Sequence, residues 1–305
     1  MTILKVDHLK IYYPVKSGSL FKSRQYVKAV DDISFTVKEG QTFALVGESG
    51  SGKSSTGRAI VGLNKVTAGK IFYNGVDVTN KAKRKKNQRI QMIFQDPYSS
   101  LNPKKRVISI VTEPLKGIKG MSRQEKWAKA ETMIRQLGMS TDTLNKYPFE
   151  FSGGQRQRIG IARSLIVRPK VIVADEPVSA LDLSVQAQVI NFMKKIQQAF
   201  HLSYVFISHD LGVVRYISDK VGIMYRGRLV ELGTNDAIFT HPQHIYTKRL
   251  IASIPALSPV GRDEAEKQRM QIEKRFEHTI HSLVDSAGKP FPLKKINNHH
   301  YVSAP

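Results

Sequence analysis

The stretch FALVGESGSGKSS, at residues 43–55, places a glycine-rich loop between a short apolar run and a helix. The apolar run FALV is long enough for a buried strand and too short for a helix. The loop matches the pattern G-x-x-x-x-G-K-[ST] through Gly47, Gly52, Lys53 and Ser54. The segment AIVGL follows as a helix that we expect to end near Gly62. This order of strand, loop and helix predicts a site for a nucleoside triphosphate, and the alternative is a glycine-rich turn without a ligand.

Each residue type in this loop has a physical part in binding phosphate. Glycine tolerates positive φ angles, so the backbone N–H groups can curl around an anion. The N-terminus of the following helix adds about half a positive charge. Lys53 is expected to reach the β- and γ-phosphates, and the Ser54 hydroxyl to ligate Mg²⁺. The predicted nucleotide-binding residues of the loop are Gly47, Ser49, Gly50, Gly52, Lys53, Ser54 and Ser55.

The composition limits the class of protein. With 305 residues the chain allows one large domain with an appendage, or two domains. A hydrophobic fraction of 41% and a charged fraction of 24% are ordinary for a soluble globular protein. The opening MTILKVDHLK lacks the apolar core of a signal peptide, and no run approaches the roughly 18 apolar residues of a membrane span, so a cytosolic location is expected. The absence of cysteine excludes disulfides, thiolate zinc sites and cysteine-bound iron–sulfur clusters.

The net charge is less ordinary. Lys plus Arg number 48 against 25 Asp plus Glu, which gives a formal charge of +23. Six of the basic side chains lie in one run, KAKRKKNQR, at residues 81–89. This balance favours a polyanionic neighbour, either nucleic acid or the anionic cytoplasmic leaflet of a membrane. The alternative is a solvated basic surface.

Strands alternate with helices around the glycine-rich loop, so we expect an α/β fold with a mostly parallel sheet covered on both faces. In the N-terminal third the expected elements are edge strands at 2–13, a loop at 14–30, a strand at 33–37, a turn at Glu39-Gly40, a hairpin at 70–78 around Asn74-Gly75 and a strand at 90–94. In the C-terminal half they are a helix from Ser152 to about Val167, a strand at 171–175, an amphipathic helix at 185–200, a strand at 203–208 and a hairpin at 221–232.

A helical insertion is expected between these two halves. Ser122 and Glu125 form a capping box, and Gly138 lies where a C-cap glycine belongs. After the last hairpin the apolar periodicity is weak, which predicts an extension that is partly ordered at best. The expected organisation is a domain at 1–255, with an antiparallel edge subdomain and a helical subdomain at about 96–160, and a C-terminal extension at 256–305.

Two carboxylates follow the apolar strand VIVAD at residues 171–175. In an open α/β sheet, ligands lie at the C-terminal ends of the strands. Asp175 is therefore placed to hold Mg²⁺ through water and to complete the site begun by Ser54. Glu176 could polarise a water for in-line attack on the γ-phosphate. The alternative is a surface Asp-Glu pair without a role.

The stretch FSGGQRQR, at residues 151–158, presents a second anion site. Ser152, Gly153 and Gly154 offer a hydroxyl and bare backbone N–H groups at a helix N-terminus. One chain has no need of two triphosphate cradles, but two chains packed head-to-tail could each offer this loop to the other's γ-phosphate. The alternative is a serine-capped helix with a glycine-rich start.

Together these stretches resemble the ATP-binding cassette family over at least residues 1–250. The resemblance implies an ATPase in which Tyr13 stacks on adenine, with Tyr12 as the alternative. It also implies that Gln95 links Mg²⁺ and the attacking water to a transport partner. The family signature is matched by Ser152, Gly153, Gly154 and Gln155, with Phe151 where leucine is more usual.

The remaining family motifs follow in the same order as in that family. Asp175 matches the Mg²⁺-site aspartate, Glu176 the catalytic base, and 179–182 the dimer-interface loop. His209 matches the histidine that contacts the γ-phosphate, although a histidine after a strand would carry no such role by itself. The resemblance thus implies the catalytic residues Glu176, His209 and Gln95, and the Mg²⁺ ligands Ser54, Gln95 and Asp175.

Longer stretches resemble the ATPases of oligopeptide and dipeptide importers. They are the insertion at 14–30, the segments QDPYSSLNP and DEPVSALD, and the segment HPQHIYTKRLIASIPALSP at 241–259. The resemblance implies a paralogous ATPase as dimer partner, two transmembrane permeases, a substrate-binding protein and a place at the cytoplasmic face of the membrane. Some relatives carry an iron–sulfur cluster in the extension, which a chain without cysteine cannot hold. We interpret His241, His244 and Tyr246 as parts of a helix packed on the core rather than as ligands.

Two other functions are compatible with these motifs. An importer ATPase for nickel, glutathione or a sugar phosphate would have a similar sequence, because other subunits choose the substrate. A soluble cassette ATPase acting on nucleic acid or ribosomes would use the positive charge directly. Two features disfavour the soluble ATPase. The chain contains a single cassette, and the segment between Gln95 and Ser152 is too short for a long coiled coil. We therefore expect no specific nucleic-acid partner.

Overall fold

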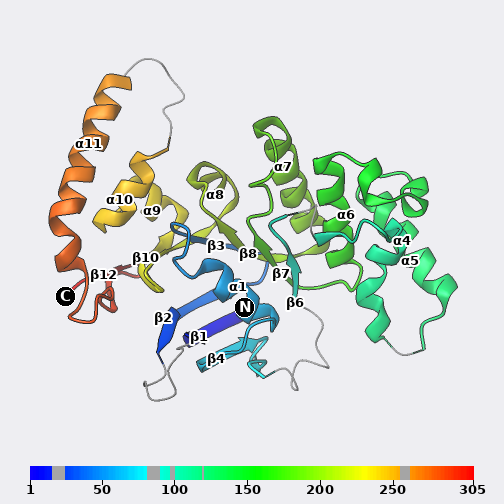
Figure 1. Ribbon diagram of the computed structural model, residues 1–305, viewed down its shortest axis with the longest axis horizontal. Helices are drawn as coiled ribbons and strands as arrows, with labels where there is room; N and C mark the ends of the chain where they lie inside the picture. The colour runs from blue at the N-terminus through cyan, green and yellow to red at the C-terminus, as the bar shows by residue number, and fades with distance from the viewer. Residues whose placement is uncertain (16–24, 81–89, 97–99, 119, 255–261) are drawn as a thin grey trace.

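The computed structural model describes residues 1–15, 25–80, 90–96, 100–118, 120–254 and 262–305 (Figure 1). The basic run at 81–89, the middle of the loop expected at 14–30 and residues 97–99 of QDPYSSLNP lie outside these ranges. Two sheets, with helices packed around them, make up the described part of the chain. No helix in these ranges is long and apolar enough to cross a membrane.

An antiparallel sheet forms the lower layer in Figure 1, with the strand order β2-β1-β4-β5. Its strands are β1 (Thr2–Pro14), β2 (Tyr26–Lys38), β4 (Ala68–Tyr73) and β5 (Val76–Asp77). The hairpin predicted at Asn74-Gly75 is confirmed, because both residues have positive φ angles and join β4 to β5. The loop predicted at 14–30 was too long. Residues 26–28 are exposed and show no apolar pattern, but they pair with the end of β1 and so belong to β2.

The core sheet has the strand order β11-β12-β10-β9-β3-β8-β7-β6. Its strands are β3 (Thr42–Val46), β6 (Ile90–Ile93), β7 (Val171–Asp175), β8 (Ser203–Ser208), β9 (Lys220–Tyr225), β10 (Arg228–Thr234), β11 (Leu293–Asn297) and β12 (His300–Ser303). The strands from β6 to β9 run parallel, whereas β10, β12 and β11 are added antiparallel. Every residue of β3, β7 and β8 is buried, as their apolar runs predicted.

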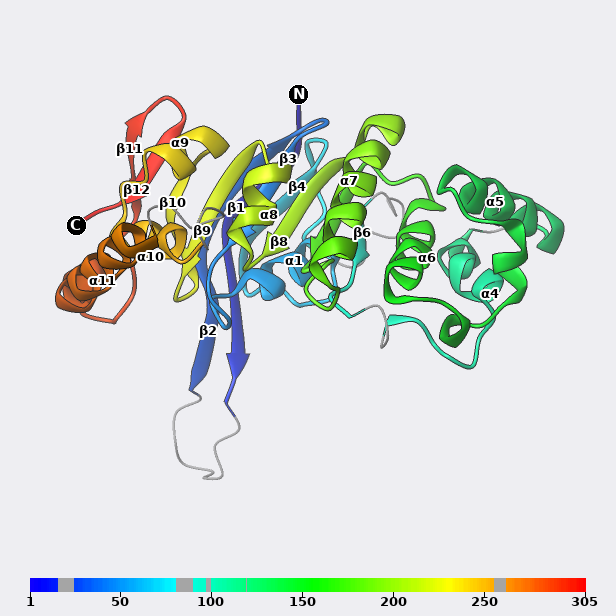
Figure 2. The same cartoon turned by 90° about the horizontal axis from the view of Figure 1, so that it is seen from above.

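Helices cover both faces of the core sheet. They are α1 (Lys53–Val61), α6 (Gly153–Leu165), α7 (Leu183–Phe200), α8 (Leu211–Ile217), α9 (Asn235–Thr240) and α10 (Ile245–Ala252). Helix α1 lies between the core sheet and the antiparallel sheet, and α7 and α8 lie on the opposite face (Figures 1 and 2). Side chains alternate along each strand, so Leu45 and Val173 join the core on the α1 side while Ala44 and Ile172 join the core on the α7 side.

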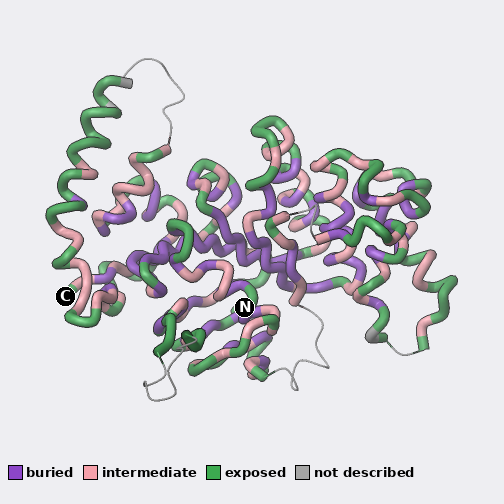
Figure 3. Tube along the Cα trace, viewed as in Figure 1, coloured by how far each residue is buried: buried purple, intermediate pink, exposed green. Residues whose placement is uncertain are grey.

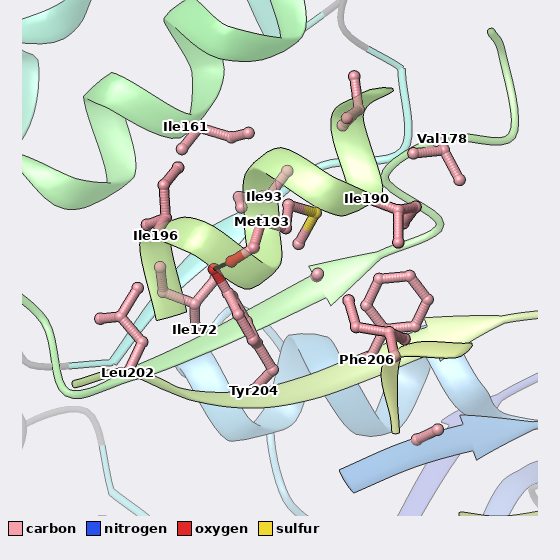
Figure 4. Close-up of a cluster of buried hydrophobic side chains, with 14 of the residues drawn as sticks. Ile93, Ile161, Ile172, Val178, Ile190, Met193, Ile196, Leu202, Tyr204 and Phe206 are labelled. Atoms are coloured by element: carbon pink, nitrogen blue, oxygen red, sulfur yellow. Dashed lines mark hydrogen bonds between the residues drawn. The ribbon is translucent and has the colours of Figure 1, made fainter. Parts of the chain in front are cut away.

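The core under α7 fixes this helix on the sheet. Ile172 and Phe206 of the strands gather there with Ile190 and Met193 of α7 (Figure 4). Tyr204 is buried among them, and its hydroxyl donates a hydrogen bond to the Met193 carbonyl at 3.3 Å. A buried tyrosine needs such a partner. Figure 3 shows that the buried part of the chain concentrates along the core strands.

The helical insertion stands at one end of the molecule, beyond β6 (Figures 1 and 2). It contains α4 (Val107–Val111), α5 (Arg123–Gln136) and the 3₁₀ helices η1 (Glu113–Gly117), η2 (Thr141–Asn145) and η3 (Pro148–Glu150). The predicted capping box of α5 is confirmed: the Ser122 N–H donates to Glu125 Oε2 at 2.6 Å, and the Glu125 N–H donates to Ser122 Oγ at 3.1 Å. Gly138 follows α5 with a φ of 71°, as a C-cap glycine should.

The C-terminal extension is more ordered than its sequence predicted. It contains α11 (Arg262–Thr279), η4 (Ile280–Leu283), β11 and β12. Strand β12 pairs antiparallel with β10 and so joins the core sheet. His300 of β12 is buried, and its Nε2 lies 2.7 Å from Oε1 of the buried Glu231 in β10. The prediction understated the order of residues 262–305, because strand pairing, the contact of Glu231 with His300 and the packing of the buried Phe276 hold this segment although its apolar periodicity is weak.

Candidate nucleotide-binding site

The loop between β3 and α1 has a backbone that only glycine fits at two positions. A Cβ atom on Gly47 would lie 2.2 Å from the Met224 carbonyl oxygen, and one on Gly52 would lie 2.3 Å from the Ala29 carbonyl oxygen. Gly52 also has a φ of 105° and is the N-cap of α1. The first turn of α1 carries no acidic side chain and no side-chain cap. Its N-terminal N–H groups and positive dipole end are therefore available to an anion.

Lys53 is the first residue of α1, and its side chain folds back over this loop. Its Nζ donates to the carbonyl oxygens of Gly47 and Glu48, both at 2.7 Å. Burial lowers the pKa of Lys53, and the negative charges of Glu176, Asp175 and Glu48 oppose that shift. A buried ammonium held by carbonyl oxygens can exchange them for phosphate oxygens, which are stronger acceptors.

Ser54 and Asp175 meet across the end of the core sheet. The Ser54 hydroxyl donates to Asp175 Oδ1 at 2.8 Å. Asp175 closes β7 and is only 2% exposed, and this burial raises the pKa of its carboxyl group. A hydroxyl and a carboxylate oxygen at this distance form a hard-oxygen donor pair, which fits Mg²⁺ completed by water and phosphate. The described residues contain no cluster of three His, Asp or Glu side chains that could hold a metal by itself.

Glu176, Gln95 and His209 converge at the same edge of the sheet. Gln95, after β6, donates through Nε2 to Glu176 Oε2 at 2.9 Å. His209, directly after β8, places Nδ1 at 3.1 Å from the same oxygen. The Glu176 backbone takes a positive φ of 46°, and its N–H donates to the Ile207 carbonyl at 2.9 Å. Three parallel strands thus bring together the three residues assigned to catalysis from the sequence.

Tyr13 and Tyr12 lie in different surroundings. The Tyr13 hydroxyl donates to Ser55 Oγ at 3.3 Å and accepts from Asn64 Nδ2 at 2.8 Å, so it lies beside α1 and the phosphate loop. The Tyr12 hydroxyl instead donates to Asp31, where burial and the Asp31 carboxylate raise its pKa to about 12. Of the two, Tyr13 is the one placed next to the loop.

The predicted signature lies apart from these residues. Ser152 caps α6 in a capping box with Gln155: the Ser152 N–H donates to Gln155 Oε1 at 3.0 Å, and the Gln155 N–H donates to Ser152 Oγ at 3.4 Å. Gly154 packs closely against Val185 of α7. In the described part of the chain, no hydrogen bond joins residues 152–155 to residues 47–55. The signature therefore does not complete the phosphate loop of its own chain.

The loop has neighbours that sequence motifs did not indicate. Glu48 contacts Tyr246 and Arg249 of α10, and Asn64 contacts Tyr13. The interpretation of His244 and Tyr246 as core-packed residues is confirmed, since they are 4% and 0% exposed. Burial lowers the pKa of His244 to about 4, so its ring is neutral. His241, by contrast, is exposed and bonds to the neighbouring Thr240.

The geometry agrees with comparisons to known proteins. A family model described as "ABC transporter" matches residues 30–179, and one described as "Oligopeptide/dipeptide transporter, C-terminal region" matches residues 230–291. The oligopeptide transport ATP-binding protein OppF of Lactococcus lactis subsp. lactis is 48% identical over 99% of this chain and 96% of that protein. This chain belongs to the ABC transporter family. It is an ABC-type ATPase of the group formed by oligopeptide and dipeptide transport ATP-binding proteins.

Two further comparisons support this family assignment. The dipeptide transport ATP-binding protein DppF of Escherichia coli is 48% identical over 87% of this chain and 82% of that protein. Among solved structures, the ATP-binding cassette MJ0796, as a dimer in a post-hydrolysis state with ADP and Pi, aligns with a TM-score of 0.65. That alignment has 26% identity and covers 76% of this ABC ATPase and 99% of MJ0796. The α/β fold expected from the sequence is thus confirmed.

Proposed function

We propose that this ABC ATPase powers the import of oligopeptides or dipeptides across the cytoplasmic membrane. The observation that carries the substrate class is the 48% identity to an oligopeptide transport ATP-binding protein over nearly the whole chain. The match of residues 230–291 to the C-terminal region of such proteins supports the same class. ATPases for nickel or glutathione import, or for nucleic-acid remodelling, are the alternatives.

The phosphate loop and Lys53 bind the β- and γ-phosphates, and Tyr13 stacks on the adenine. Ser54, Asp175 and Gln95 would hold Mg²⁺, which neutralises charge on the phosphate oxygens when bound. Lys53 then exchanges its carbonyl partners for phosphate oxygens. Asp175 is buried beside Ser54 and near Lys53. The oxygen atoms that would hold the cation and the ammonium that would bind the triphosphate are therefore neighbours.

Glu176 acts on the attacking water. Its carboxylate accepts the proton of the water as the water oxygen bonds to the γ-phosphorus and the bond to the β–γ bridging oxygen breaks. Gln95 and His209 hold the carboxylate through Oε2. His209 would also contact the γ-phosphate. After Gln95, the described residues 100–103 would border the groove that receives a membrane subunit, so hydrolysis and transport are coupled there.

The separation of the signature from the phosphate loop argues for a head-to-tail pair of cassettes. Ser152, Gly153, Gly154 and Gln155 would complete the nucleotide site of a second, paralogous ATPase, whose signature in turn completes this one. Two permeases and an extracellular or periplasmic binding protein would form the rest of the importer. The ATPase then lies at the cytoplasmic face of the membrane, where its charge of +23 suits anionic lipids.

Peptide uptake in a deletion strain tests this assignment. Deletion of the chain is expected to abolish uptake of labelled di- to pentapeptides while the binding protein still binds peptide. The parent gene should restore uptake, and the Lys53→Ala gene should not. Normal peptide uptake in the deletion strain, without a second copy of the gene, contradicts the proposal. Loss of nickel or glutathione uptake in place of peptide uptake would favour the alternative importers.

A further inference from the structure

Helix α10 holds the second residue of the phosphate loop at two points. Arg249 Nη1 lies 2.8 Å from Glu48 Oε1, and the Tyr246 hydroxyl accepts the Glu48 backbone N–H at 3.0 Å. The Glu48 carbonyl in turn accepts from Lys53 Nζ at 2.7 Å. Glu48 is therefore fixed through its side chain, its N–H group and its carbonyl group, and the last of these partners is the lysine assigned to the phosphates.

Helix α11 fixes the two residues of α10 that make these contacts. Glu273 binds Arg249 Nε with both carboxylate oxygens, at 3.0 and 2.7 Å. The Arg249 guanidinium lies 4.6 Å from the centre of the Phe276 ring, and this ring also packs against Tyr246. Phe276 is 5% exposed and Tyr246 is fully buried. The contacts among Glu48, Tyr246, Arg249, Glu273 and Phe276 form what we call the Glu48 clamp.

The negative charge of Glu48 lies in the loop assigned to phosphate, so the clamp can affect the affinity for anions. Glu48 places a carboxylate in the loop that binds triphosphate, and its negative charge acts on Lys53. Arg249 pairs with this carboxylate and shares its positive charge with Glu273. Without Arg249, the half-exposed Glu48 side chain would be free to approach Lys53 and to repel phosphate.

We propose that Arg249 is a positioning residue for the nucleotide site, which sets the affinity for ATP by holding the Glu48 carboxylate in an ion pair. Through Glu273 and Phe276, the C-terminal extension thereby acts on the phosphate loop. The inference rests on the proposed assignment of this loop to the nucleotide phosphates. It adds to that assignment a role for α10 and α11, which lie about 200 positions further along the chain.

Nucleotide binding to the purified full-length protein tests the clamp. The Kd values for fluorescent ATP and ADP analogues with Mg²⁺ are measured for the parent, Arg249→Met, Glu48→Gln and the double variant. Arg249→Met is expected to weaken ATP binding about 10-fold, on the scale of measured couplings between contacting residues, and ADP binding less. Adding Glu48→Gln should restore most of the loss, because the repelling charge is then gone. Lys248→Met, at the next position on α10, is the matched control and should bind as the parent does.

Three outcomes would contradict the clamp. Equal weakening of ATP and ADP without rescue by Glu48→Gln would mean that Arg249 is merely structural, and would overturn the inference. Parental ATP affinity in Arg249→Met, while Lys53→Ala binds poorly, would overturn it and leave the nucleotide site intact. Parental affinity in Lys53→Ala would remove the assigned site and the clamp with it. Thermal unfolding of each variant identifies any loss of fold.

Discussion

The centre and the outer edge of the core sheet are held together by different forces. At the centre, β3, β7 and β8 run parallel and every residue in them is buried. At the edge, β11 is mostly exposed, and β12 is held to β10 by strand pairing and by the buried pair of His300 and Glu231. The centre is an apolar scaffold with the site residues at its strand ends, whereas the edge adds a buried polar contact to strand pairing and to the packing of Leu293 and Tyr301. We therefore expect substitutions at the centre to change the rate of ATP hydrolysis and substitutions at the edge to change the free energy of unfolding.

The largest effect is expected at the centre. Glu176→Gln removes the base while an amide oxygen can still accept from Gln95, so the fold and ATP binding should be kept. Turnover in the assembled transporter should fall by about 10²-fold or more, the scale of losing a positioned base. Steady-state ATPase assays with the purified complex measure this, and Glu277→Gln on the exposed side of α11 is the control. Parental turnover in Glu176→Gln would remove the role assigned to this carboxylate.

At the edge, His300→Ala should change stability rather than chemistry. It leaves Glu231 as a buried carboxylate with only the N–H groups of Gln243 and His244 as described partners. Leaving a buried carboxyl group without this hydrogen-bond partner costs up to about 3 kcal/mol of unfolding free energy. Denaturant unfolding measures the loss, and the exposed neighbour His299 provides the control His299→Ala. An unchanged midpoint in His300→Ala would show that strand pairing alone holds β12.

A smaller effect is expected where the extension meets the antiparallel sheet. Burial of Asp31 opposes its ionisation, but hydrogen bonds from Lys289 and Tyr12 and the charge of Arg228 prevail and lower its pKa from 3.8 to about 2. The Asp31 carboxyl group of the folded protein therefore stays ionised at a pH where the same group of the unfolded chain already takes up a proton. The resulting stability is complete above pH ~4 and is lost as the pH falls toward ~2, a total of about 2 kcal/mol.

Unfolding curves at several pH values between ~5 and ~2.5 test this linkage. The parent should lose stability faster than Asp31→Asn over this range, because the variant has no carboxyl group at position 31 to titrate. Asp32→Asn, at the adjacent exposed position, should follow the parent. Parallel curves for the parent and Asp31→Asn would mean that the ionised Asp31 contributes no stability.

The elements that the sequence predicted are those that one short stretch determines by itself. Apolar runs predicted β3, β7 and β8, and the glycine pattern predicted the loop at Gly47 and Gly52. Asp175 and Glu176 could be assigned because they lie at the C-terminal end of an apolar strand, which faces the site in an open α/β sheet. His209 was assigned only through the resemblance to the ATP-binding cassette family. The capping box of Ser122 needs only two residues three positions apart, so it too could be seen locally.

The parts that the sequence did not predict depend on pairs of distant residues. The ion pair of Glu48 and Arg249 joins positions 201 apart, and neither residue type at its position indicates the other. The same holds for Glu231 and His300, which lie 69 positions apart. The start of β2 was missed because its side chains are exposed, and its pairing with β1 alone makes it a strand. Propensity and periodicity contain no information about such pairings.

Glu231 has a consequence for the way the molecule opens locally. Its carboxylate accepts N–H groups from Gln243 and His244, just before α10, and also contacts His300 of β12. Because one buried group contacts both segments, we expect the start of α10 and β12 to open together, with similar protection of their amide hydrogens from exchange. Tyr246 lies in the first turn of α10 and accepts the Glu48 N–H. Each transient release of β12 from the sheet edge would therefore loosen the contact of Tyr246 with the phosphate loop.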